Sequence, residues 1–126
     1  MAISTHTLGK SERLKSRKQI NALFEQGRKL MVFPFRIIHK IEPGEPGLKA
    51  GFTVSSRNFP RAVDRNRIKR LMREAYRQQK QSFEEKLTSQ QQGAILFFIY
   101  IGRDMPAFPA VCQAIKQGLD KLEIKR

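Results

Sequence analysis

The basic stretch that decides the fold prediction reads SRNFPRAVDRNRIKRLMREAYRQQK, from Ser56 to Lys80. Apolar residues recur within it every three or four positions, which is the period of a helix with one buried side. These apolar residues are Ile68, Leu71, Met72, Ala75 and Tyr76. The spacing therefore predicts an amphipathic helix that packs on a core through this side.

The same stretch concentrates the positive charge of the chain. From Arg57 to Lys80 it holds nine basic and two acidic residues, a formal charge of +7 out of +14 for the whole chain. On a helix the basic side chains gather away from the apolar stripe, with Asn66 among them. Cations four residues apart, such as Arg65 and Lys69, repel each other, so a polyanion is expected as the counter-charge. A solvated basic helix without a specific partner is the alternative that the pattern leaves open.

Length and composition favour one folded, basic domain. The chain has 126 residues, of which 40% are hydrophobic, and this is enough for a single core. A charge of +14 points to a nucleic acid first and to an anionic membrane surface second. The single Cys112 excludes an intrachain disulfide and is expected as a small buried residue of a helix. Because the N-terminus has no apolar signal-peptide core, we expect a cytoplasmic protein with no membrane-spanning segment.

The remaining segments predict an α+β order. The expected elements, in chain order, are a helix at 16–26, strands at 30–41 and 48–55, the basic helix, a buried strand at 94–101 and a helix at 107–124. Turn residues at 42–47 predict that the second strand returns antiparallel to the first, and residues 78–93 are expected as a helix end and a loop. We therefore expect a single nucleic-acid-binding domain over residues 1–126, with 1–12 flexible and a central sheet covered by helices.

Two details of these elements bear on a binding site. In the strand 48–55 small polar residues alternate with apolar ones, so Thr53 and Ser55 face either water or the floor of a groove. In the first helix Phe24 is expected in the core, and in the predicted strand 30–41 Phe33 is expected on the apolar side. The basic residues between 10 and 18 are either a solvated tail or a second phosphate contact.

Residues for a self-sufficient catalytic site are not evident in the sequence. The three aspartates, Asp64, Asp104 and Asp120, are scattered rather than paired as a two-metal site requires. His6 and His39 have no adjacent acid or nucleophile, and there is no Gly-rich phosphate loop. The chain is better explained as a binder of RNA or DNA, although a site assembled from distant residues stays open.

The helix sequence RNRIKRLMREAY, from Arg65 to Tyr76, follows the strand GFTVS at 51–55, and together they resemble the signature of the bacterial ribonuclease P protein component. The likeness extends from about Leu14 to Leu122. The family protein is the small subunit of a ribonucleoprotein endonuclease that removes the 5′ leader from precursor tRNA. The resemblance implies that the RNA subunit, with Mg²⁺, carries out the hydrolysis and that the protein is non-catalytic. It also implies an αββαβα sandwich with a left-handed βαβ crossover, which the general handedness rule would not predict.

The resemblance implies two sets of contact residues. The RNA-subunit-binding set is Arg65, Asn66, Arg67, Lys69, Arg70 and Arg73. The leader-binding set, which lines a groove along the sheet, is Phe24, Arg36, Ile38, Thr53, Ser55 and Arg57. Ile20 and Ile38 stand where relatives carry aromatic residues, so base stacking would be lost at these two positions.

The main alternative function is a structural RNA-binding protein of a ribosome-like particle. A protein-only nuclease is disfavoured by the scarcity of clustered acids. A membrane binder is disfavoured because the apolar side of the basic helix is needed to cover the sheet. The expected partners are the ribonuclease P RNA subunit and the precursor tRNA leader. We expect no obligate protein partner, no membrane association, and no cofactor or metal site on the protein. Mg²⁺ is expected to act with the RNA subunit.

Overall fold

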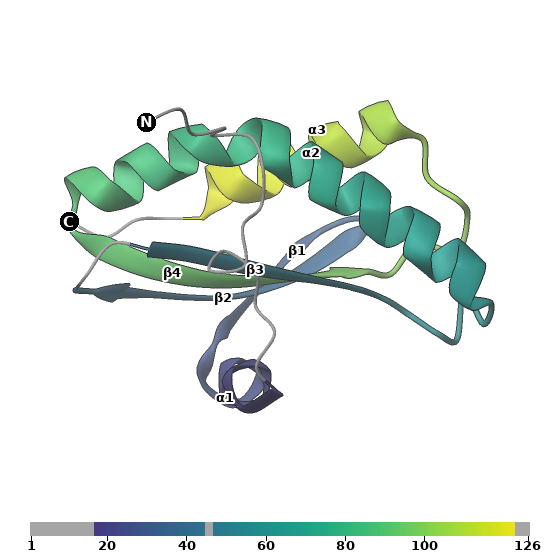
Figure 1. Ribbon diagram of the computed structural model, residues 1–126, viewed down its shortest axis with the longest axis horizontal. Helices are drawn as coiled ribbons and strands as arrows, with labels where there is room; N and C mark the ends of the chain where they lie inside the picture. Colours follow the sequence, from purple (N-terminus) through teal and green to yellow (C-terminus); the bar gives the residue numbers. More distant parts are fainter. Residues whose placement is uncertain (1–16, 45–46, 123–126) are drawn as a thin grey trace, which may run out of the picture.

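A computed structural model describes residues 17–44 and 47–122 of the chain (Figure 1). Within these residues the elements are α1 (Arg17–Gln26), β1 (Arg28–Val32), β2 (Phe35–Pro43), β3 (Gly47–Val54), α2 (Ala62–Ser89), β4 (Gln92–Tyr100) and α3 (Phe108–Lys121). The α+β prediction is confirmed, with one more strand than the sequence indicates. The expected start of the first helix at Ser16 and the flexible segment 1–12 lie outside the described residues.

The strands form a mixed sheet in the order β1-β2-β4-β3. β1 is antiparallel to β2, and β2 is antiparallel to β4, whereas β3 lies parallel to β4. β2 and β3 therefore run in opposite directions, as predicted, but β4 is inserted between them. α2 connects β3 to its parallel neighbour β4, which is the predicted βαβ crossover; its left-handedness stays a prediction.

Helices cover the two faces of the sheet unequally. α2 and α3 lie on one face, and α1 lies on the other (Figure 1). α2 packs on β3 and β4, whereas α3 packs on β1 and β2. The main core fills the space beneath α2 and α3, and its largest fully buried side chains include Tyr76, Phe35 and Phe98. A smaller core of Leu23, Ile38 and Phe97 holds α1 against the opposite face.

The prediction of one strand over 30–41 is wrong, because the chain turns back at Phe33 and Pro34. Val32 pairs with Phe35 across this turn, so β1 and β2 form a hairpin. Proline has no backbone N–H to donate to a strand ladder, which explains why the pairing is interrupted there. Phe33 is 74% exposed at the tip of the hairpin and does not face the core.

α2 is longer than predicted and includes most of the segment expected to be a loop. It begins at Ala62 and ends at Ser89. Phe83 and Leu87 continue the buried stripe of Tyr76 at helical spacing. The glutamines between Tyr76 and Phe83 make this segment polar, so the helical period is hard to recognise in the sequence. At the other end of the chain α3 ends at Lys121, and Cys112 is half-buried, less covered than the sequence suggests.

Candidate nucleic-acid interface

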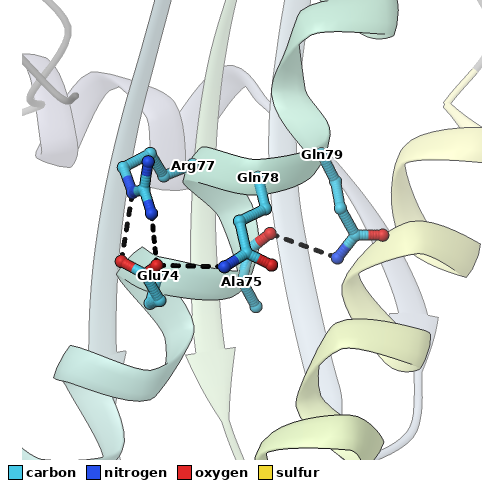
Figure 2. A network of polar contacts seen from close by, with 5 residues as sticks. All are labelled: Glu74, Ala75, Arg77, Gln78 and Gln79. Atoms are coloured by element: carbon cyan, nitrogen blue, oxygen red, sulfur yellow. Dashed lines mark hydrogen bonds and ion pairs between the residues drawn. The ribbon is translucent and has the colours of Figure 1, made fainter. Parts of the chain in front are cut away.

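The contacts of α2 with α3 determine where its basic side lies. Gln79 extends toward α3 and donates a hydrogen bond of 2.9 Å to the carbonyl of Cys112, and another of 3.1 Å to the carbonyl of Ala75 in its own helix (Figure 2). At about 100° per residue, Lys69 and Arg73 lie about 80° and 120° around α2 from Gln79. Since α2 covers β3 and α3 covers β1 and β2, the side of α2 that faces away from α3 lies beside the free edge of β3.

The exposed part of α2 carries most of the predicted RNA-subunit-binding residues. Asn66, Arg67, Arg70 and Arg73 are exposed, and Lys69 is half-buried. Among the residues that the structure describes, the three arginines have no carboxylate partner. We call Asn66, Arg67, Lys69, Arg70 and Arg73 the α2 basic surface. Its charge is not compensated within the described fold, which is the arrangement that a polyanion would neutralise.

Arg65 differs from the other predicted residues because its guanidinium is used inside the protein. Its Nη1 donates to the carbonyl of Phe59 at 2.9 Å and to the carbonyl of Pro60 at 2.7 Å. Phe59 is itself buried against the main core. Arg65 therefore holds the loop between β3 and α2 on the first turn of the helix, a role that the sequence pattern did not indicate.

The basic side of α2 is no longer uncompensated where Glu74 occurs. This carboxylate accepts hydrogen bonds from Arg77, through Nε at 3.0 Å and also through Nη2, and from Gln78 at 3.0 Å (Figure 2). The hydrogen bonds from Arg77 are the main reason that the pKa of Glu74 lies below its ordinary value. Because Glu74 stays ionised at neutral pH, it compensates Arg77, and the uncompensated surface ends at Arg73.

The sheet face that carries α1 brings together several predicted leader-binding residues. The strand register places Arg36 of β2 opposite Ile99 of β4, and Ile99 opposite Thr53 of β3. Arg36 and Thr53 thus share one row, about 10 Å apart across two strand spacings. Met31 of β1 extends the same row beyond Arg36 and is 50% exposed. The row offers a cation, one small polar group and a thioether, all on one face.

Phe24 of α1 contacts the neighbouring row of this face, which holds Ile38, Phe97 and Gly51. Phe24 is 43% exposed, so the prediction that it is a core residue is wrong. Its ring meets that of Phe97 edge to face, with 5.5 Å between the centroids. Phe97 pairs with Gly51 of β3, which has no side chain to fill the space beside the ring. Phe24 is therefore anchored by one aromatic contact and keeps part of its surface open.

Two further predicted leader residues extend this set, and one departs from it. Ser55 follows β3 directly, and its N–H donates to the carbonyl of Tyr100 at 3.3 Å. Arg57 is exposed in the loop that follows. Ile38, in contrast, is 1% exposed beneath α1, where it packs in the smaller core of Leu23 and Phe97. Its side chain cannot reach a ligand on this face, so Ile38 is corrected from a contact residue to a support for α1.

Acidic groups are sparse near both surfaces. Asp64 lies in the first turn of α2, Asp104 in the loop after β4, and Asp120 near the end of α3. In the described part of the chain no three His, Cys, Asp or Glu side chains come together as a metal site would require. Within residues 17–44 and 47–122, no helix combines the length and the apolar character needed to cross a membrane.

A mixed four-stranded sheet with an uncompensated basic helix on one face is typical of a small nucleic-acid-binding protein. The sequence profile of the family described as Ribonuclease P matches residues 8–123. The chain therefore belongs to the ribonuclease P protein component family, which places it in tRNA processing.

Relatives of this family resemble the chain over most of its length. The ribonuclease P protein component of Porphyromonas gingivalis (strain ATCC 33277) is 35% identical over 121 residues, which cover 94% of this chain and 88% of that protein. The fold matches the RNase P protein from Thermotoga maritima, with a TM-score of 0.69 at 21% identity over 89% of this chain and 98% of the other. It also matches the Staphylococcus aureus RNase P protein, with a TM-score of 0.65 at 18% identity over 88% and 94% of the two chains.

Proposed function

We propose that this protein is the protein subunit of ribonuclease P and that it promotes removal of the 5′ leader from precursor tRNA in the cytoplasm. The α2 basic surface binds the RNA subunit, and the α1-side face of the sheet holds the leader. One observation carries the proposal: Arg67, Arg70 and Arg73 are exposed together on one helix without a carboxylate partner in the described fold. Arginine suits this role because its planar fork can donate two hydrogen bonds to one phosphate.

The two surfaces are joined by a short, well-anchored loop. β3 ends at Val54 and α2 begins at Ala62, so residues 55–61 run from one surface to the other. Arg57 and Arg61 are exposed in this loop. Asn58 donates to the carbonyls of Ile101 and Gly102 at 3.3 and 3.2 Å, which fixes the loop to the end of β4. An RNA subunit bound to α2 would therefore present its substrate close to the leader face.

The leader face suits a single strand of variable sequence. Thr53 and Ser55 leave room above the sheet, whereas Arg36 and Arg57 can meet phosphates. The open part of the Phe24 ring can stack on a base, because every base has a π face. Phosphate contacts position a strand without reading its sequence. This combination predicts binding that tolerates many leader sequences.

In this proposal the hydrolysis belongs to the RNA subunit, with Mg²⁺ bound to the complex rather than to the protein. Phosphodiester hydrolysis by a protein with two metal ions needs carboxylates that converge within a few ångströms. Here the described aspartates belong to separate elements. The protein contributes by positioning two RNAs relative to each other.

Equilibrium binding to the reconstituted complex tests the leader role. The affinities of precursor tRNA and of mature tRNA are compared for the wild type, Phe24→Ala and Arg36→Ala, with Arg103→Ala as an exposed control outside both surfaces. We expect the wild type to prefer the precursor. Phe24→Ala should lose about 1–3 kcal/mol of that preference at most, the range for one stacked base, and Arg36→Ala should lose part of it with a reduced salt dependence, because it removes a phosphate contact. Equal affinities for the two wild-type substrates, together with salt-dependent RNA binding, would instead indicate a structural RNA-binding protein.

A further inference from the structure

A cavity of about 500 Å³ lies at the end of the sheet away from the β1–β2 turn. It is lined by the C-terminal end of α1, the start of β1, the second half of β2, the start of β4 and the C-terminal end of α3. None of its lining residues belongs to the α2 basic surface or to the predicted leader set. We call it the β1–α3 pocket.

The lining of the β1–α3 pocket is strongly basic. Four cations and the single carboxylate of Glu42 line the pocket, and the cations are Arg28, Lys29, Lys40 and Lys121. Strand alternation places Lys29, Lys40 and Glu42 on the α1 side of the sheet and Arg28 on the α3 side, so the lining comes from both sides of the sheet. Glu42 is already engaged, because its Oε1 lies 2.7 Å from Nζ of Lys40. Among the residues that the structure describes, the other three cations have no carboxylate partner. Like charges around one cavity repel each other, and a bound anion would remove that repulsion.

The donor groups of the pocket suit a phosphate. Arg28 of β1 is directly opposite His39 of β2 in the strand register, so both side chains lie on the α3 side of the sheet. Lys121 reaches the same cavity from the last turn of α3. A guanidinium, an ammonium and an imidazole N–H form a set of donors, which is the chemistry that recognises a phosphate group.

His39 can report on occupancy of the pocket. Burial lowers the pKa of His39 below its ordinary value, and the positive charge of Arg28 lowers it further. The charged groups that line the pocket with His39 are Arg28 and Lys121 on the α3 side of the sheet and Lys29, Lys40 and Glu42 on the α1 side, where α1 contributes the neutral Gln26. An anion among these groups would favour the protonated imidazole, so occupancy should raise the pKa of His39.

We propose that the β1–α3 pocket binds a phosphate group, either a phosphodiester of an RNA backbone or free inorganic phosphate. The site is separate from both surfaces assigned above and lies at the opposite end of the sheet from the loop 55–61. Its existence does not depend on the proposed function, since inorganic phosphate is a sufficient ligand for the test.

The test is an NMR titration of the full-length protein, freed of nucleic acid, with inorganic phosphate against sodium chloride at matched ionic strength. The imidazole signals of His39 are assigned with the variant His39→Gln. Two double variants lose the same charge: Arg28→Ala with Lys121→Ala in the pocket, and Lys86→Ala with Lys116→Ala as exposed controls. We expect phosphate to shift the His39 signals saturably in the wild type and the control, with at least about tenfold weaker binding in the pocket variant, as loss of a charged hydrogen bond predicts.

Failure of phosphate to shift His39 beyond the chloride reference would overturn the proposal, as would an equal loss of binding in the two double variants. A second arm identifies the source of the phosphate. If a short single-stranded oligouridylate displaces inorganic phosphate from His39, the pocket takes an RNA phosphodiester. If phosphate binds and the oligonucleotide does not compete, the pocket takes the free anion.

Discussion

Removing three arginines of the α2 basic surface should change the salt dependence of RNA binding by a predictable amount. Arg67, Arg70 and Arg73 are exposed and lack a carboxylate partner among the described residues, so each is free to meet one phosphate. Each lost phosphate contact lowers the slope of log affinity against log salt by about 0.7 to 0.9, so the triple alanine variant should lose about two to three units. Over a fourfold rise in salt, the wild type should then weaken by roughly 20- to 40-fold more than the variant.

The assay is binding of the ribonuclease P RNA subunit, followed by fluorescence anisotropy over a range of potassium chloride concentrations. A matched control replaces Lys86, Arg103 and Lys116 with alanine, which removes the same charge from exposed positions elsewhere. Thermal unfolding should be nearly unchanged in both variants, because exposed substitutions usually alter stability by less than about 0.5 kcal/mol. If both triple variants reduce the slope equally, binding follows net charge alone, and the reasoning that assigns the contacts to α2 is wrong.

Three further predictions concern the support of these surfaces. Arg65→Ala should weaken RNA binding and also lower the free energy of unfolding by about 1–2 kcal/mol, since it removes two hydrogen bonds to the loop; unchanged denaturant stability would contradict the second part. Gly27→Ala should destabilise the protein by about 1–3 kcal/mol, because a Cβ there would lie 2.5 Å from the carbonyl oxygen of Leu23 at the end of α1; a wild-type melting temperature would show that α1 can adjust. Tyr100→Phe should cost about 0.5–1.5 kcal/mol in urea unfolding, because the phenol donates a 2.7 Å hydrogen bond to the carbonyl of Asp104, and a more stable variant would refute this role.

The elements that the sequence predicts well are those whose periodicity is strong. Ile68, Met72 and Tyr76 repeat at helical spacing, and all three are buried in α2. The apolar run at 94–101 corresponds closely to β4, one of the two strands that pair on both sides. In both cases the spacing of the apolar residues along the chain is enough to indicate which side chains are buried.

The parts that could not be predicted depend on contacts between distant segments. The insertion of β4 between β2 and β3 cannot be inferred from local turns, which indicate only strand direction. Phe24 and Phe33 are apolar residues at positions that fit a core by spacing, yet both are exposed. Their exposure follows from how α1 and the β1–β2 hairpin lie on the sheet, which a one-dimensional period does not contain.

In the candidate site, too, features that follow from local spacing were predicted, and features that depend on contacts between distant segments were not. The basic positions of α2 follow from helical spacing, and the structure exposes Arg67, Arg70 and Arg73 as expected. The role of Arg65 depends on backbone carbonyls in the preceding loop, which no residue pattern displays. The burial of Ile38 depends on α1 covering that part of the sheet, so position within a motif did not predict it.

The most direct test of the account is cleavage of precursor tRNA by the cognate RNA subunit at low Mg²⁺, with and without this protein. The account predicts that the RNA subunit alone removes the leader slowly and that adding the protein restores accurate 5′ processing. The triple variant of Arg67, Arg70 and Arg73 should restore it only at higher protein concentration. If the RNA subunit gains nothing from the wild-type protein, although the protein still binds RNA, the proposed role in leader removal is contradicted.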